Sequence, residues 1–124
     1  MVMNSSLQSK LGECELSAVY FDFDESTLSK QATGALAEMW KCLSSGTPFK
    51  RLVISGHTDE RGTTEYNLAL GNRRAEAVRK YLTGLGAEAR KLKAISFGEE
   101  RPVAMGSDEE AWAKNRRVEL TAEK

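Results

Sequence analysis

The sequence predicts an α+β sandwich, with a mixed four-stranded sheet, helices packed on one of its faces and the element order βαβαββ. Strand-like and helix-like segments alternate along the chain as strand, helix, strand, helix, strand, loop and strand. Strand–helix–strand units have right-handed crossovers, which bring the helices to the same face of a sheet. The 124 residues, 40% of them hydrophobic, suffice for one modest core.

The first half of the chain contains two strands and one helix. The first strand is expected over about residues 16–23, because apolar and polar side chains alternate there. The first helix follows, with apolar residues at helical spacing from Leu28 to Leu43 and Ser29 as its N-cap. The second strand is expected over residues 49–55.

The second half begins with the longest helix. It is expected over about residues 64–85, with Thr63 as its N-cap. A third strand follows over residues 92–97. Residues 98–114 are interpreted as a long loop with one helical turn around Trp112, a residue expected to act as a lid over the core. The last strand comes after this loop.

The long helix carries an arginine where an apolar residue is expected. At about 100° per residue, its apolar stripe consists of Leu70, Val78, Tyr81, Leu82 and Leu85. Asn67 and Arg74 fall inside this stripe. An unpaired guanidinium against a core costs on the order of several kcal/mol, so Arg74 needs a partner, either another side chain or a ligand carboxylate. On this view, removing the Arg74 charge leaves the fold intact and could even stabilise it.

The loop before the helix supplies a complementary charge. Asp59 follows the apolar run Leu52-Val53-Ile54, so it is expected at the carboxyl end of a strand and close to the helix N-terminus. A carboxylate and a guanidinium on two sides of a pocket suit a zwitterionic ligand. The alternative is a plain Asp59–Arg74 ion pair that holds the loop to the helix, and physics alone favours this alternative.

Four motifs, in order and at matching spacing, resemble the OmpA-like peptidoglycan-binding domain family. They are Phe21-Asp22-Phe23-Asp24, GHTDERGTTEYNLALGNRRAEAVRKYL over residues 56–82, Ser96-Phe97-Gly98 and Asn115-Arg116-Arg117-Val118-Glu119-Leu120. Within that family, Asp59-Glu60-Arg61-Gly62 most resembles the peptidoglycan-associated lipoproteins. The resemblance extends over nearly the whole domain.

The resemblance implies non-covalent binding of peptidoglycan through the meso-diaminopimelate of its stem peptide. The residues that grip this ligand in the family correspond to Asp59 and Arg74, and Asn67 matches a further contact. Backbone amides just after the first strand also hold the ligand in the family, which implicates residues 22–26. Asp24 and Leu70 complete the expected ligand site.

The resemblance also implies partners and a location. The domain is expected to be periplasmic and to tether the outer membrane to the cell wall, with a lipid anchor upstream. Its expected protein partner is the periplasmic β-propeller protein of the Tol system. Two other functions stay open. One is a small periplasmic enzyme that acts on peptidoglycan fragments with Asp59 as its base, and the other is a pure protein-interaction module.

Charge and motif content argue against several function classes. Lysine plus arginine equals aspartate plus glutamate, at 18 each, so no net charge attracts nucleic acid. The only histidine, His57, is interpreted as a strand-end residue beside the pocket, with no cysteine near it in sequence to complete a metal set. A G-x-S-x-G elbow is also missing. We therefore expect no catalytic residue, cofactor or metal site.

Four further side chains have less certain roles. Asp22 and Asp24 are interpreted as caps for the first helix in preference to a catalytic carboxylate pair. Of Arg116 and Arg117, one is expected to face solvent and the other to pair with an acid.

The N-terminal residues and the two cysteines complete the predictions. Residues 1–13 are expected to be a disordered linker, followed by the domain over residues 14–124. Cys14 and Cys42 are expected to form a disulfide, since cysteines in a periplasmic domain are more often paired than free. The geometry allows it, because a first helix of about 21 Å returns antiparallel to a first strand of about 30 Å. The alternative is two buried thiols that pack as small hydrophobic groups.

Overall fold

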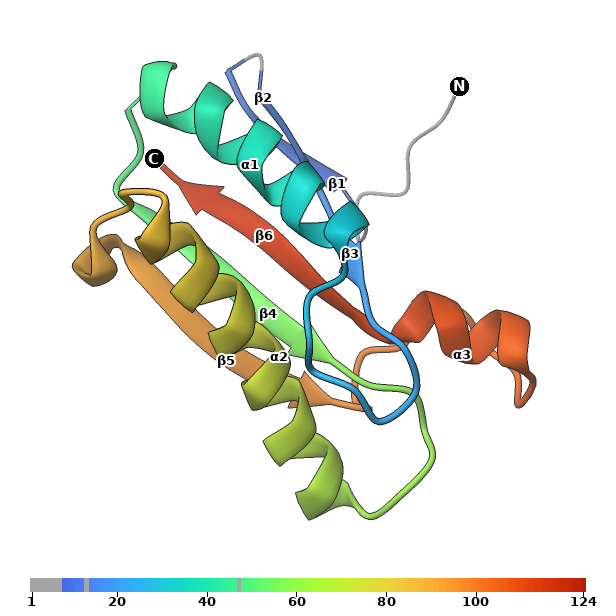
Figure 1. The fold of residues 1–124 in the computed structure, drawn as a ribbon. Helices are drawn as coiled ribbons and strands as arrows, with labels where there is room; N and C mark the ends of the chain where they lie inside the picture. The colour runs from blue at the N-terminus through green and yellow to red at the C-terminus, as the bar shows by residue number, and fades with distance from the viewer. Residues whose placement is uncertain (1–7, 13, 47) are drawn as a thin grey trace.

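The four-stranded sheet has the strand order β3-β6-β4-β5 (Figure 1). The computed structural model describes residues 8–12, 14–46 and 48–124. Its elements are β1 (Gln8–Leu11), β2 (Cys14–Ser17), β3 (Val19–Tyr20), α1 (Lys30–Ser45), β4 (Arg51–His57), α2 (Thr64–Gly84), a 3₁₀ turn (Ala89–Lys91), β5 (Leu92–Gly98), α3 (Glu109–Asn115) and β6 (Arg117–Glu123). β4 runs parallel to β5 and antiparallel to β6, which is itself antiparallel to β3. The prediction of an α+β fold with a mixed sheet is confirmed.

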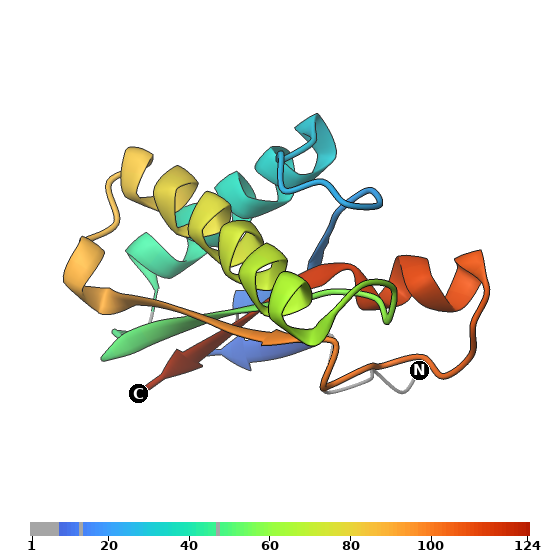
Figure 2. The same ribbon diagram turned by 90° about the horizontal axis from the view of Figure 1, so that it is seen from below.

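The core lies between the sheet and the two long helices. Figure 2 shows α1 and α2 on the same side of the sheet. The most deeply buried apolar side chains come from both layers: Leu36, Leu52, Ile54, Val78, Leu82 and Val118. No helix among the described residues is long and apolar enough to cross a bilayer.

Both long helices begin at the residues that cap chemistry predicts. The hydroxyl of Ser29 accepts a hydrogen bond from the Ala32 N–H at 3.1 Å, and that of Thr63 accepts one from the Tyr66 N–H at 3.1 Å. Each bond satisfies one of the N–H groups that have no partner inside the helix. The start of α2 is thereby fixed directly after the loop that carries Asp59.

The N-terminal part of the fold differs from the prediction. β1 pairs antiparallel with β2, and Leu11 is 1% exposed, so the expectation of a disordered linker is wrong for residues 8–12. Residues 1–7 and residue 13 lie outside the described residues. The single strand expected over residues 16–23 is instead divided into parts of β2 and β3, and Phe23 is 53% exposed.

β4 and α2 approach each other unusually closely. A Cβ atom on Gly56 would lie 1.8 Å from the carbonyl oxygen of Gly71, and one on Gly71 would lie 2.3 Å from Oγ of Ser96. A side chain at Gly56 requires a shift of the backbone, and one at Gly71 requires that the Ser96 hydroxyl move. The contact brings the first half of α2, with Asn67 and Arg74, down onto the carboxyl end of β4.

Cys14 and Cys42 form a disulfide in the structure, with their Cα atoms 5.8 Å apart. The bond joins the start of β2 to the last turn of α1. We expect its removal in a Cys14→Ser, Cys42→Ser variant to lower the free energy of unfolding by about 3 kcal/mol, because the bridge restricts the unfolded chain. Urea unfolding of parent and variant measures this difference.

The pairing itself can be tested by a count of free thiols in denaturant without reductant. The count should give no free thiol per chain, and two free thiols would contradict the pairing.

Candidate ligand-binding site

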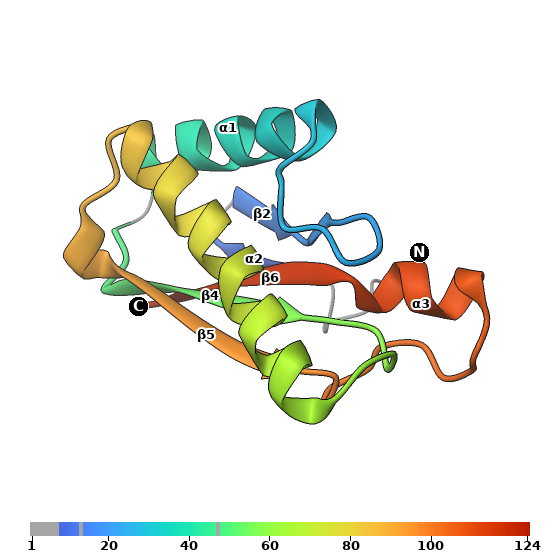
Figure 3. The ribbon, with the colours of Figure 1, turned by 60° about the horizontal axis from the view of Figure 1, so that its bottom comes forward.

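A pocket of about 240 Å³ lies at the carboxyl end of β4. The N-terminal end of α2, the loop after β3 and α3 gather at this end of the sheet (Figure 3). Ten residues line the pocket: Phe23, Asp24, Thr58, Asp59, Arg61, Gly62, Tyr66, Asn67, Leu70 and Arg74. The structure thus brings together all five residues that the sequence assigned to a ligand site.

Arg74 is completely buried and is held by main-chain carbonyls. Its Nε, Nη1 and Nη2 atoms donate to the carbonyl oxygens of Glu25, His57 and Asp22 at 2.8, 2.9 and 3.0 Å. Burial lowers the pKa of Arg74 to about 10, so its guanidinium remains charged at neutral pH.

These bonds involve a kind of partner that neither alternative for Arg74 considered, because main-chain carbonyls accept them. Neither a hydrogen bond nor an ion pair joins Asp59 to Arg74 in the structure, so the plain ion pair is not formed. A guanidinium has five N–H groups, and the three carbonyl bonds use three of them. Its positive charge has no carboxylate bound to it, which leaves this end of the pocket suited to an anionic group.

Asp59 lies on the other side of the pocket and is 4% exposed. Its carboxylate accepts hydrogen bonds from the main-chain N–H and the guanidinium of Arg61, and Nη1 of Arg116 lies 3.6 Å away. Burial by itself would raise the pKa of Asp59, but the hydrogen bonds from Arg61 and the charges of both arginines outweigh it and lower that pKa. Asp59 is therefore an anion at neutral pH.

The OmpA family matches residues 20–116 of the chain. The chain belongs to the OmpA family. It is 47% identical to the peptidoglycan-associated lipoprotein of Pseudomonas aeruginosa over 95% of this chain and 69% of that protein. The crystal structure of the peptidoglycan-associated lipoprotein from Burkholderia pseudomallei superposes with a TM-score of 0.80 at 48% identity, over 86% of this chain and 89% of that one. The cell wall anchor of the T6SS from Pseudomonas aeruginosa is similar with a TM-score of 0.72 at 25% identity, over 87% and 80% of the two chains.

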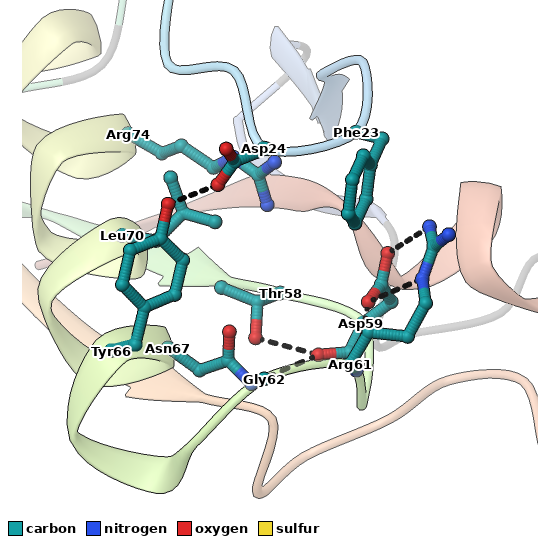
Figure 4. A pocket seen from close by; sticks show the side chains of 10 residues that line it. All are labelled: Phe23, Asp24, Thr58, Asp59, Arg61, Gly62, Tyr66, Asn67, Leu70 and Arg74. Atoms are coloured by element: carbon teal, nitrogen blue, oxygen red, sulfur yellow. Dashed lines mark hydrogen bonds and ion pairs between the residues drawn. The ribbon is translucent and has the colours of Figure 1, made fainter.

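In this OmpA-family domain, Asp24, Asn67 and Leu70 are the other three predicted site residues that line the pocket. Asp24 has a φ of 58° and accepts a hydrogen bond from the Tyr66 hydroxyl (Figure 4). Asn67 is buried and donates to Oε1 of Glu99 at 2.7 Å, whereas Leu70 is 4% exposed and apolar. The interpretation of the two aspartates as helix caps is wrong, because Ser29 caps α1.

Two aromatic side chains and Arg61 form a stack that the sequence did not predict. The Cζ atom of Arg61 lies 3.9 Å from the ring centre of Phe23 and 3.9 Å from that of Trp112. Trp112 on α3 therefore covers the Arg61 guanidinium, and the expectation that it covers the core is wrong. No local pattern predicts this contact, since its three members come from separate loops and a short helix.

Arg116 and Arg117 are both buried, so the expectation that one faces solvent is wrong. Arg116 pairs with Glu109 at 2.8 Å and donates to the carbonyl oxygen of Phe21 at 2.9 Å. Arg117 pairs with Glu119 at 2.6 Å on the sheet face that points away from the helices. Arg116 thus connects α3 to the loop that forms one wall of the pocket.

His57 contributes its carbonyl oxygen to the site but not its ring. The ring is 2% exposed and stacks on Phe97, with 5.5 Å between the ring centres, on the sheet face away from the helices. The expectation that this side chain lies beside the pocket is wrong, because residues alternate between the two faces of β4. Among the described residues, neither ring nitrogen has a hydrogen-bond partner, and no group of three side chains that could hold a metal ion was found.

Proposed function

We propose that this domain binds peptidoglycan non-covalently through the meso-diaminopimelate of the stem peptide. One observation carries the proposal: a buried carboxylate and a buried guanidinium, Asp59 and Arg74, line opposite sides of one small pocket without pairing with each other. Such a pair complements a carbon centre that bears both an ammonium and a carboxylate group.

The chemical groups of diaminopimelate match the anionic, cationic and apolar sides of the pocket. Its free amino-acid centre would place the ammonium towards Asp59 and the carboxylate towards Arg74. The methylene groups next to that centre would lie against the apolar side chain of Leu70. Asn67 and the loop around Asp24 would hold the polar remainder of the ligand.

The relatives support the wider role. Proteins named peptidoglycan-associated lipoproteins are 47% identical to this chain, and a cell wall anchor has the same fold. On this basis we propose that the domain is periplasmic and tethers the outer membrane to the cell wall, with a lipid anchor upstream of this chain. We also propose the β-propeller protein of the Tol system as its protein partner.

The geometry favours binding over the alternative of a small enzyme. A general base needs a pKa near the working pH, but the two arginines beside Asp59 lower its pKa from an already acidic value. The His57 ring, the only imidazole of the chain, lies on the other face of the sheet. Asp59 is therefore suited to hold a cation rather than to remove a proton.

An Asp59→Asn variant tests the proposed function. We expect it to lose retention on purified diaminopimelate-type sacculi, since losing a charge-assisted contact costs about 1.5–3 kcal/mol, or roughly ten- to a hundredfold in affinity. Co-sedimentation with sacculi measures the effect. Glu76→Gln, an equal charge change on the exposed side of α2, is the matched control and should sediment like the parent. Equal retention of the Asp59→Asn variant and the parent would contradict the assignment.

A further inference from the structure

The carboxylate of Asp59 is almost fully occupied before any ligand arrives. Oδ1 accepts the main-chain N–H of Arg61 at 3.0 Å and its Nε at 3.3 Å, while Oδ2 accepts its Nη2 at 2.8 Å. A carboxylate offers about four acceptor positions. The one that remains is close to Nη1 of Arg116, at 3.6 Å from Oδ2.

Electrostatics opposes the addition of a further cation to this arrangement. Arg61 and Arg116 already place two positive charges around one carboxylate. An ammonium group that approached while both arginines were in place would be a third positive charge, in a site where little water screens the repulsion. Exchange of one cation for another avoids this repulsion, whereas addition does not.

The structure also indicates which arginine can leave. The Arg61 side chain is 31% exposed, and it lies on a loop between two aromatic rings that attract it whether or not Asp59 does. Glu60 and Glu109 are further anions close enough to raise its pKa. The Arg116 side chain is only 8% exposed and is fixed by Glu109 and a main-chain carbonyl.

We infer that Arg61 is an exchangeable counter-ion of Asp59, which the ammonium group of the ligand must displace, and that it thereby determines how tightly the site binds. This inference rests on the proposed function. A ligand with only an ammonium group replaces one ion pair by another and gains little. A ligand that also carries a carboxylate gains the contact with Arg74 in addition. Arg61 thus keeps singly charged amines from occupying the pocket.

An Arg61→Gln variant tests the inference with calorimetric titrations of meso-diaminopimelate and of Nα-acetyl-lysine methylamide, whose only charge is its side-chain ammonium group. Arg101→Gln is the matched control, because Arg101 also lies over an aromatic ring, 3.8 Å from the centre of Phe97, but on the sheet face away from the pocket. We expect Arg61→Gln to bind both ligands about tenfold more tightly than the parent, since one charge-assisted contact no longer has to be broken. Arg101→Gln should bind like the parent.

The outcomes separate this inference from the proposed function. If the parent binds diaminopimelate and Arg61→Gln binds it equally or more weakly, Arg61 is not displaced and the inference is wrong. If neither the parent nor Arg101→Gln binds, the proposed function fails, and the inference with it. A second measurement uses the parent alone: the Nε–H signal of Arg61 in NMR spectra should lose its protection from exchange when diaminopimelate is added, and unchanged protection would overturn the inference.

Discussion

Replacement of Arg74 by alanine is expected to abolish ligand binding and to lower the free energy of unfolding by about 3–5 kcal/mol. The loss of stability arises because the carbonyl groups of Asp22, Glu25 and His57 each lose a hydrogen bond from the guanidinium, and a cavity remains beneath the helix. The buried His57 carbonyl that loses this bond costs about 1–3 kcal/mol, and the removal of a buried charge offsets part of the total. Urea unfolding and sacculus co-sedimentation measure the two effects.

The neighbouring arginine provides the control. Arg73 lies on the exposed side of the same helix, so Arg73→Ala should change stability by less than about 0.5 kcal/mol. Arg74→Lys keeps the charge but not the planar fork, and should bind the ligand weakly while retaining part of the stability. An Arg74→Ala protein as stable as the parent would show that the carbonyl contacts do not hold the loop in place.

His57 is expected to make the domain sensitive to acid. Burial, followed by the charges of Arg117 and Arg101, lowers the pKa of His57 to about 3 from its ordinary value of 6.5. Between these two pH values the unfolded chain binds a proton at His57 that the folded chain does not bind. The free energy of unfolding therefore falls as pH falls below about 6.5, by up to about 1.4 kcal/mol per pH unit and by about 3 kcal/mol in all between pH 7 and pH 4.

A His57→Phe variant isolates this contribution. Phenylalanine retains a flat ring against Phe97 and does not titrate. Urea unfolding at several pH values should show the parent losing about 3 kcal/mol more than the variant between pH 7 and pH 4. Asp59, whose lowered pKa acts in the same direction, is present in both proteins and cancels in the comparison. Parallel stability curves would mean that His57 is protonated in the folded domain.

Local patterns were sufficient for much of the fold and for the two charges of the site. Helical periodicity placed Arg74 inside an apolar stripe, and cap chemistry located the starts of α1 and α2 at Ser29 and Thr63. The position of Asp59 followed from the end of β4 and the start of α2, which are only a few residues apart. These features depend on neighbours within one or two turns of the chain.

The remaining features depend on contacts between distant segments. The Arg61 stack needs Phe23 and Trp112. The partners of Arg74 are carbonyls of the loop after β3 and of the last residue of β4, which no spacing in the helix reveals. These carbonyls reverse the expected sign of the Arg74→Ala effect on stability. The position of the His57 ring, in contrast, could have been predicted from the sequence. Side chains alternate along β4, and this alternation places the ring on the face opposite the pocket.

Competition between free meso-diaminopimelate and Nα-acetyl-lysine methylamide separates recognition of the carboxylate from recognition of the ammonium alone. The α-amino and carboxyl groups of the lysine derivative are blocked, so it presents an ammonium group with no carboxylate beside it. If Arg74 binds the terminal carboxylate of diaminopimelate, free meso-diaminopimelate should release the domain from sacculi, and the lysine derivative should require roughly a ten- to hundredfold higher concentration. Sedimentation at increasing concentrations of each compound gives the two midpoints. Equal midpoints for the two compounds would contradict the proposed role of Arg74, because the buried guanidinium would then have no part in recognition.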